Sequence, residues 1–125
     1  MRTMKTNDLI DDTLDWVVAT CEGEEVEYIN DGITRCLLRK STGRYAPSTN
    51  WSQAGPIIER EVIGVEPVKD LSSVVVGWVA GFVYPDLQFG GVAYCEQSGD
   101  TPLIAAMRCY VASKLGDTVE LPEEL

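Results

Sequence analysis

The chain contains no histidine. Histidine is the residue most often used as a general base near neutral pH, and it is a common transition-metal ligand. Its absence excludes Ser-His-Asp and Cys-His catalytic arrangements. The cysteines Cys21, Cys36, Cys95 and Cys109 lie far apart in the sequence, so no CxxC pair for a metal or a redox centre is present either. We therefore predict a protein that is not an enzyme and uses no metal or cofactor.

Long apolar runs are also missing. The longest one, residues 74–84, is interrupted by Gly77 and Gly81 and is far shorter than the roughly 20 residues that a membrane-spanning helix needs. The first ten residues are polar and lack the apolar segment of a signal peptide. We expect a protein of the cytoplasm whose cysteines are reduced and partly buried.

Positive charge is scarce. The chain has 10 lysines and arginines against 20 aspartates and glutamates, which gives a formal net charge of −10. A protein that binds nucleic acid needs a basic face to displace counterions from phosphates, so direct binding of nucleic acid is not expected. The acidic balance is compatible with solubility alone, with a basic protein partner, or with mimicry of nucleic acid, and solubility is the interpretation that general considerations favour.

What the sequence does contain is one well-defined helix near its C-terminus. Thr101 is a suitable N-cap, and Pro102 takes the first helical position, where a missing N–H costs nothing. Gly116 is suited to end the helix. Between them, apolar side chains recur at helical spacing, namely Leu103, Ala106, Met107, Tyr110 and Val111. Such a stripe must be buried against apolar surface, most economically a sheet, so we expect a small globular domain around it.

The rest of the sequence alternates short helices and strands. We predict helices over residues 11–22 and about 50–61, a hairpin over 25–39, and strands over 74–84 and 92–95. Residues 64–73 and 87–91 are predicted as loops, and the acidic tail 117–125 is expected to fray. The expected fold is a single α+β domain spanning residues 1–125. It is a layered α/β/α-type sandwich with about four mainly antiparallel strands and three helical segments.

Three aspartates, Asp11, Asp12 and Asp15, cluster at the start of the first predicted helix. Their spacing is not that of a calcium-binding loop, and no further ligand is identifiable. We predict that they form the solvated first turn of the helix rather than a metal site.

Two longer stretches resemble a known family. Residues 47–61, beginning Pro-Ser-Thr-Asn-Trp, and residues 101–116, beginning Thr-Pro-Leu, are similar to the NinX-type proteins of lambdoid, enterobacterial phages. Leu14-Asp15-Trp16 and the segment that follows it fit as well. The same layout resembles small phage domains described as α-β-α sandwiches. The resemblance implies a tailed-phage accessory protein in the host cytoplasm, and it supplies no catalytic residues because the function of the family is unknown.

Both of these stretches place Ser or Thr hydroxyls at the start of a helix. Free amides and the positive end of the helix dipole suit such places to anions. Neighbouring aromatic rings are suited to stacking on a base, and arginines to pairing with phosphate or carboxylate. The predicted ligand-binding residues are Arg44, Tyr45, Ser48, Thr49, Asn50, Trp51, Arg60, Thr101 and Arg108. The prediction requires both helix starts to face one cavity, and each residue also has a purely structural interpretation as a cap or a core side chain.

These observations favour a non-enzymatic phage accessory protein that binds a small anionic, nucleotide-derived ligand. Such a protein can sequester a host immune signal and so counter antiphage defence. The alternative is an acidic inhibitor or DNA mimic that blocks a basic host protein. The expected partners are thus a small nucleotide-type ligand or a host protein, without membrane or direct nucleic-acid contact. A homodimer or higher oligomer is a third interpretation, because ligand sites often form between subunits.

Overall fold

The computed structural model describes residues 1–39, 43–82 and 94–125, the last range without the side chain of Tyr94. Within these ranges the helices are α1 (Asp11–Glu22), α2 (Trp51–Glu61) and α3 (Pro102–Leu115), with a short 3-10 helix, η1, at Thr6–Asp8. The strands are β1 (Arg2–Lys5), β2 (Val26–Asn30), β3 (Arg35–Arg39), β4 (Gly43–Arg44), β5 (Gly64–Lys69), β6 (Val75–Phe82), β7 (Tyr94–Gly99) and β8 (Thr118–Leu121). The predicted α+β class is confirmed, with more strands than the four or so expected.

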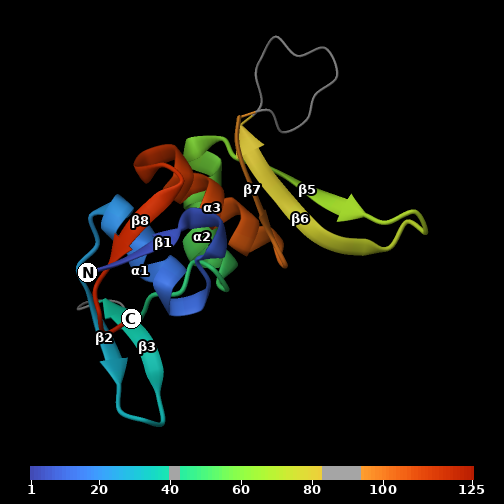
Figure 1. Cartoon of the computed structure of the whole chain (residues 1–125). Helices are drawn as coiled ribbons and strands as arrows, with labels where there is room; N and C mark the ends of the chain where they lie inside the picture. The colour runs from blue at the N-terminus through green and yellow to red at the C-terminus, as the bar shows by residue number, and fades with distance from the viewer. Residues whose placement is uncertain (40–42, 83–93) are drawn as a thin grey trace.

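Helix α3 is the centre of the fold (Figure 1). Its predicted cap is present, because the Thr101 hydroxyl oxygen accepts a hydrogen bond from the Ile104 N–H at 3.1 Å. The helix contacts α1, α2, β5, β6 and β7, and these neighbours bury it on nearly every side. Its buried residues are Leu103, Ile104, Ala105, Ala106, Met107, Cys109, Tyr110, Val111 and Ala112. More residues of α3 are buried than the apolar stripe in the sequence predicts, so α3 is a core helix.

The strands form three small antiparallel sheets. β1 pairs with β8, and the other two sheets have the orders β2-β3-β4 and β5-β6-β7. The predicted hairpin over 25–39 corresponds to β2 and β3, and its turn has Gly32 at a φ of 86°. The third sheet packs on α3, with Ala80 fully buried in the core.

The C-terminal tail does not fray. Thr118–Leu121 forms β8, which pairs with β1 in the register Arg2↔Leu121 to Lys5↔Thr118. Val119 and Leu121 alternate with exposed residues and are buried in the core, as expected for a strand with one covered face. The prediction of a frayed tail is therefore wrong. The acidic composition of the segment indicates fraying, but the burial of these two apolar side chains holds it in the fold.

The loop predicted over residues 64–73 is also wrong for most of its length. It contains β5, whose Pro67 lies opposite Trp78 of β6. Proline indicates a loop in many sequences because it has no backbone N–H to donate. An outer strand such as β5 tolerates it, because one edge of the strand makes no hydrogen bonds within the sheet. The last predicted strand continues to Gly99 as β7. Three predicted segments lie outside the described ranges: the first residues of this last strand, the end of the 74–84 strand and the loop over 87–91.

Candidate functional site

The loop that leads into α2 is held in shape by its own hydrogen bonds. The Gln53 side chain donates to the Arg44 carbonyl at 2.8 Å and accepts from the Ala46 N–H at 2.6 Å. The N–H groups of Thr49 and Asn50 both donate to the Ala46 carbonyl, at 3.0 and 2.9 Å. Residues 44–50 therefore form a fixed turn in front of the helix.

Asn50 is the N-cap of α2, at the position where the sequence places the helix start. Its Oδ1 accepts hydrogen bonds from the Ser52 N–H at 2.9 Å and from the Ser52 hydroxyl at 2.6 Å. The N–H groups of Gln53 and Ala54 donate to the Asn50 carbonyl. Most of the first-turn amides are thus already paired, so an anion at this helix start must rely mainly on side chains.

A hollow of about 390 Å³ opens beside this turn. Trp51 at its rim is 59% exposed, and the exposed Arg44 forms no ion pair with any described residue. Among the described residues, the hydroxyl of Thr49 makes only a 3.4 Å hydrogen bond, with the Ala46 carbonyl. The residues that line the hollow are Arg44, Ala46, Thr49, Asn50 and Trp51. An accessible ring, an exposed cation without an ion pair in the described part of the chain, and two polar side chains are groups suited to a small molecule with an aromatic ring and an anionic group.

Two of the predicted ligand residues are instead buried. Tyr45 is 4% exposed, and its ring lies 4.9 Å from the guanidinium carbon of Arg39. Burial raises the pKa of its hydroxyl, as expected for a core tyrosine. Ser48 is 1% exposed. Tyr45 presents only its small exposed fraction to a separate hollow of about 220 Å³, and neither side chain lines the hollow beside Trp51. The prediction for both residues is therefore corrected: they are core side chains.

Ser48 belongs to a buried polar contact that the sequence did not indicate. Its N–H donates to Asp15 Oδ1 of α1 at 2.8 Å, and the Asp15 side chain is almost completely buried. Burial raises the pKa of Asp15 to about 7, against the opposing effect of hydrogen bonding from Ser48. The prediction that Asp15 shares a solvated turn with Asp11 and Asp12 is wrong. Instead, Asp15 ties α1 to the turn that precedes α2.

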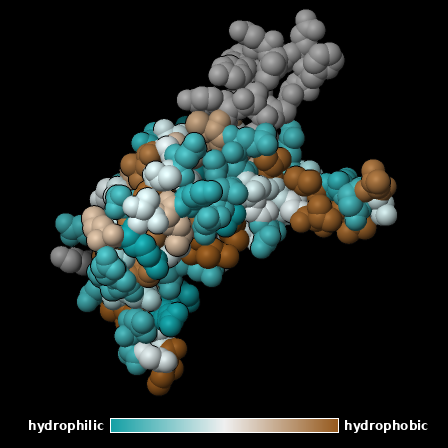
Figure 2. All heavy atoms as spheres, in the orientation of Figure 1, coloured by the Kyte–Doolittle hydropathy of each residue, from teal (hydrophilic) through white to brown (hydrophobic). Residues whose placement is uncertain are grey.

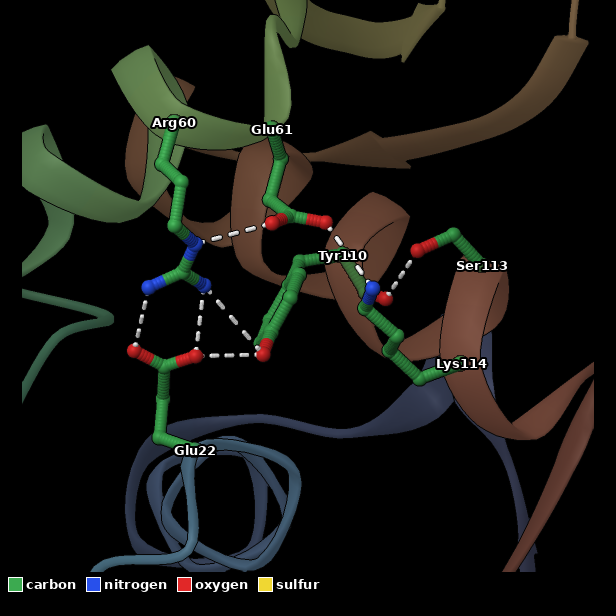
Figure 3. A network of polar contacts seen from close by, with 6 residues as sticks. All are labelled: Glu22, Arg60, Glu61, Tyr110, Ser113 and Lys114. Atoms are coloured by element: carbon green, nitrogen blue, oxygen red, sulfur yellow. Dashed lines mark hydrogen bonds and ion pairs between the residues drawn. The ribbon is translucent and has the colours of Figure 1, made fainter.

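Arg60 lies in a cluster where α1, α2 and α3 meet (Figure 3). Its guanidinium donates to both carboxylate oxygens of Glu22, at 3.0 and 2.6 Å, and to Glu61 at 2.8 Å. Lys114 pairs with the other oxygen of Glu61 at 3.0 Å, and the Tyr110 hydroxyl donates to Glu22. Hydrogen bonds from Arg60 lower the pKa of both glutamates. Because its donors are engaged by carboxylates, Arg60 joins three helices rather than lining the hollow beside α2.

The remaining two predicted residues belong to α3, Thr101 at its N-cap and Arg108 in its middle. Thr101 caps that helix, and Arg108 donates to the carbonyls of Leu9 and Ser98, both at 2.8 Å. Arg108 lines a separate hollow of about 270 Å³ with Trp78 and Asp100. No residue of the α2 start lines that hollow, and no residue of α3 lines the one beside Trp51. The two helix starts therefore do not share either of these hollows, contrary to the sequence expectation.

A larger hollow, of about 420 Å³, lies on β2 and β3 and is lined by Glu25, Val26, Glu27, Leu38 and Arg39. Its two glutamates oppose an anionic ligand. The candidate site is therefore the hollow of about 390 Å³ beside α2, hereafter the Trp51 hollow. It retains Arg44, Thr49, Asn50 and Trp51 of the predicted set.

No helix in the described ranges is long and apolar enough to cross a membrane. The model of the family described as "Bacteriophage P22, NinX" matches residues 5–114, which include α1, the Trp51 hollow and almost all of α3. No curated protein matches the chain. Because the family model covers most of the sequence, the chain is a phage protein and belongs to the NinX family.

Proposed function

We propose that the chain is a non-enzymatic phage accessory protein that binds a small anionic, nucleotide-derived molecule at the Trp51 hollow in the host cytoplasm. The observation that best supports this is the pairing of Trp51, 59% exposed, with the exposed Arg44 on one rigid turn. Full burial of a large apolar side chain contributes roughly 1.5–3 kcal/mol, and the exposure of Trp51 forgoes part of that free energy. A stacking role accounts for its exposure, and the neighbouring cation accounts for the choice of an anion.

Each lining residue has a role in this arrangement. The Trp51 indole stacks on the ring of the ligand, and Arg44 pairs with phosphate through its planar guanidinium. The Thr49 hydroxyl exchanges its 3.4 Å bond with Ala46 for one with the ligand. The turn is already fixed by Gln53, so binding requires little ordering of the backbone. A phage protein that binds such a molecule without converting it acts by sequestration, and a host immune signal is the proposed target.

Calorimetry with cyclic nucleotides and ADP-ribose derivatives tests the proposal. We expect binding of at least one of these compounds, weakened by Trp51→Ala by about 1–3 kcal/mol, the usual contribution of stacking between an aromatic side chain and a base. Arg44→Ala should also weaken binding and reduce its dependence on salt. Arg35→Ala removes another exposed arginine and serves as the control, which should bind like the unmodified chain.

The absence of binding heat across the panel would contradict the proposal. So would binding that neither Trp51→Ala nor Arg44→Ala changes. The alternative function, an acidic inhibitor of a basic host protein, predicts instead a salt-sensitive protein complex that is unaffected by the loss of Trp51.

A further inference from the structure

The hairpin formed by β5 and β6 extends away from the helices, and apolar side chains cover its outer end (Figures 1 and 2). Leu71 in its turn is fully exposed, and Val74 and Val76 are 56% and 61% exposed. The turn is well ordered by hydrogen bonds: Asp70 Oδ1 accepts from the N–H groups of Ser72 and Val74, at 2.8 and 3.0 Å. The hairpin therefore presents Leu71 as a fixed apolar projection.

A second apolar feature lies where α2 ends and β5 begins. A hollow of about 350 Å³ is lined there by Ile58, Glu59, Val62, Ile63 and Gly64. Val62 is 76% exposed and closes α2 in the left-handed conformation, with a φ of 55°. That conformation is one in which glycine or asparagine is usual, and a β-branched residue is rare. The surface thus carries an exposed valine at a position where a polar or small residue would normally be found.

The projection and the hollow lie at opposite ends of the same strand. Pro67 is midway in sequence between Ile63, in the hollow, and Leu71, at the tip. Consider two antiparallel copies related by a two-fold axis near Pro67. The projection of each copy then lies against the hollow of the other copy. A two-fold interface requires one surface that is complementary to itself, and a projection and a hollow at the two ends of one strand meet that requirement. A different protein as partner would not need both features at the two ends of one strand.

Two further observations fit a second copy. β5 is the outer strand of the sheet ordered β5-β6-β7, so its other edge is unpaired within the described ranges. Pro67 has no backbone N–H and therefore leaves a gap among the hydrogen-bond donors of β5. Contact through side chains is thus favoured over a continuous strand ladder. The ionisable residues of the hollow, β5 and the turn are Glu59, Glu66, Lys69 and Asp70, a formal charge of −2, so the proposed contact carries a minor part of the net charge of −10.

We propose that two copies of the chain associate through their β5–β6 hairpins, with Leu71 of each copy seated against Val62 and Ile63 of the other. This inference does not depend on ligand binding at the Trp51 hollow. Its test is the oligomeric state, measured by sedimentation equilibrium from micromolar to millimolar concentration. The unmodified chain should approach twice the 13.7 kDa mass of one copy as its concentration rises.

Leu71→Asp and Val62→Asp should each weaken association by at least about tenfold, because each places a charge in the apolar contact. Neither should impair folding, since both side chains are exposed and aspartate tolerates the left-handed conformation at position 62. Ile33→Asp, in the turn of the other hairpin at 95% exposure, is the matched control and should leave association unchanged. Combining Leu71→Asp with Val62→Lys should restore part of the association through an ion pair between copies.

A chain that stays monomeric over the whole concentration range would overturn the proposal. A dimer that Leu71→Asp leaves intact would do the same. Weakening by Leu71→Asp without weakening by Val62→Asp would also overturn it, because the projection would then contact some other surface or another protein.

Discussion

At the scale of single residues, Asp15 is the most unusual side chain described. It is a carboxyl group in the core, with the Ser48 N–H as its hydrogen-bond donor. Sequence reasoning placed it on the surface with Asp11 and Asp12, because consecutive acidic residues at a helix start are normally solvated. What distinguishes Asp15 is its position one residue after Leu14 and two before Val17, on the buried side of α1. That signal was present in the sequence, but the acidic cluster obscured it.

The raised pKa of Asp15 predicts a specific dependence of stability on pH. Below about pH 4 the carboxyl group is protonated in both the folded and the unfolded chain. Between its ordinary pKa of 3.8 and the value of about 7 only the folded chain keeps the proton, so stability falls as pH rises through this window. Above it the loss is complete, at up to about 4 kcal/mol. Glu22 and Glu61 act in the opposite direction, but only as pH falls through their lowered pKa values.

Asp15→Asn should therefore flatten the dependence between pH 5 and 8 and stabilise the chain at pH 8. Asparagine keeps an oxygen acceptor for the Ser48 N–H while it removes the ionisable group. Urea unfolding at both pH values measures this, with Asp11→Asn at an exposed neighbouring position as the control. An Asp15→Asn variant whose stability changes with pH as steeply as that of the unmodified chain would show that Asp15 is not the group responsible.

Arg60 illustrates why residue type alone cannot assign a ligand contact. In the sequence it is an arginine close to the Pro-Ser-Thr-Asn-Trp motif, which suits phosphate binding. In the folded chain its partners are Glu22, from α1, and Glu61, the next residue. The pairing with Glu22 spans 38 positions and depends on how α1 and α2 pack. No local pattern carries that information, so the cluster in Figure 3 could only be found from the fold.

At the scale of secondary-structure elements, the helices were predictable and several strands were not. α1, α2 and α3 carry local start and stop signals, such as Asn50 and Thr101 as caps and Gly23 in the left-handed conformation at the end of α1. The strands β1, β4 and β8 are two to four residues long, too short for a period of two to stand out. Their existence depends on pairing with partners elsewhere in the chain, which local propensity does not encode.

The contact between β7 and α3 gives a prediction at this scale. A Cβ atom on Gly99 would lie 2.7 Å from the Ala105 backbone nitrogen and 2.8 Å from Ile104 Cγ2, so the strand end could not stay where it is. Gly99→Ala should destabilise the chain by about 1–3 kcal/mol, the usual cost of overpacking. Gly77→Ala is the matched control on the neighbouring strand. Its added Cβ would meet the nearest atom at an ordinary 3.5 Å. Equal urea midpoints for the two variants would mean that α3 and β7 separate without cost.

At the scale of the whole molecule, two parts of the chain that resemble NinX proteins meet in space. Asp15, from the Leu14-Asp15-Trp16 segment, bonds to Ser48 of the Pro-Ser-Thr motif, and the turn that follows forms the Trp51 hollow. The family pattern thus includes residues that shape the turn from inside and residues that line the hollow outside. The sequence placed the buried Ser48 in one ligand set with the exposed Thr49 and Trp51, because it could not separate buried from exposed members.

The pairing of the chain ends gives the last prediction. Deleting residues 118–125 removes β8, and with it the burial of Val119 and Leu121 and the partner of β1. At roughly 1.5–3 kcal/mol for each buried apolar side chain, the loss is about 3–6 kcal/mol, a large part of the stability of a small domain. Deleting only 122–125 keeps β8. It removes the exposed hydrogen bond from Arg2 to the Leu125 carbonyl and the exposed ion pair between the N-terminus and Glu123, which contributes about 0–1 kcal/mol.

Urea unfolding of the two deletion variants separates these contributions. The longer deletion should lower the midpoint strongly and the shorter one little. η1 should keep its tether in both, because Thr6 bonds to the carbonyls of Gly116 and Asp117, which precede the deletions. If both deletions lower the midpoint equally, the stabilisation comes from the last four residues rather than from β8. A large difference would establish that the acidic C-terminal segment belongs to the core of the fold through its two apolar side chains.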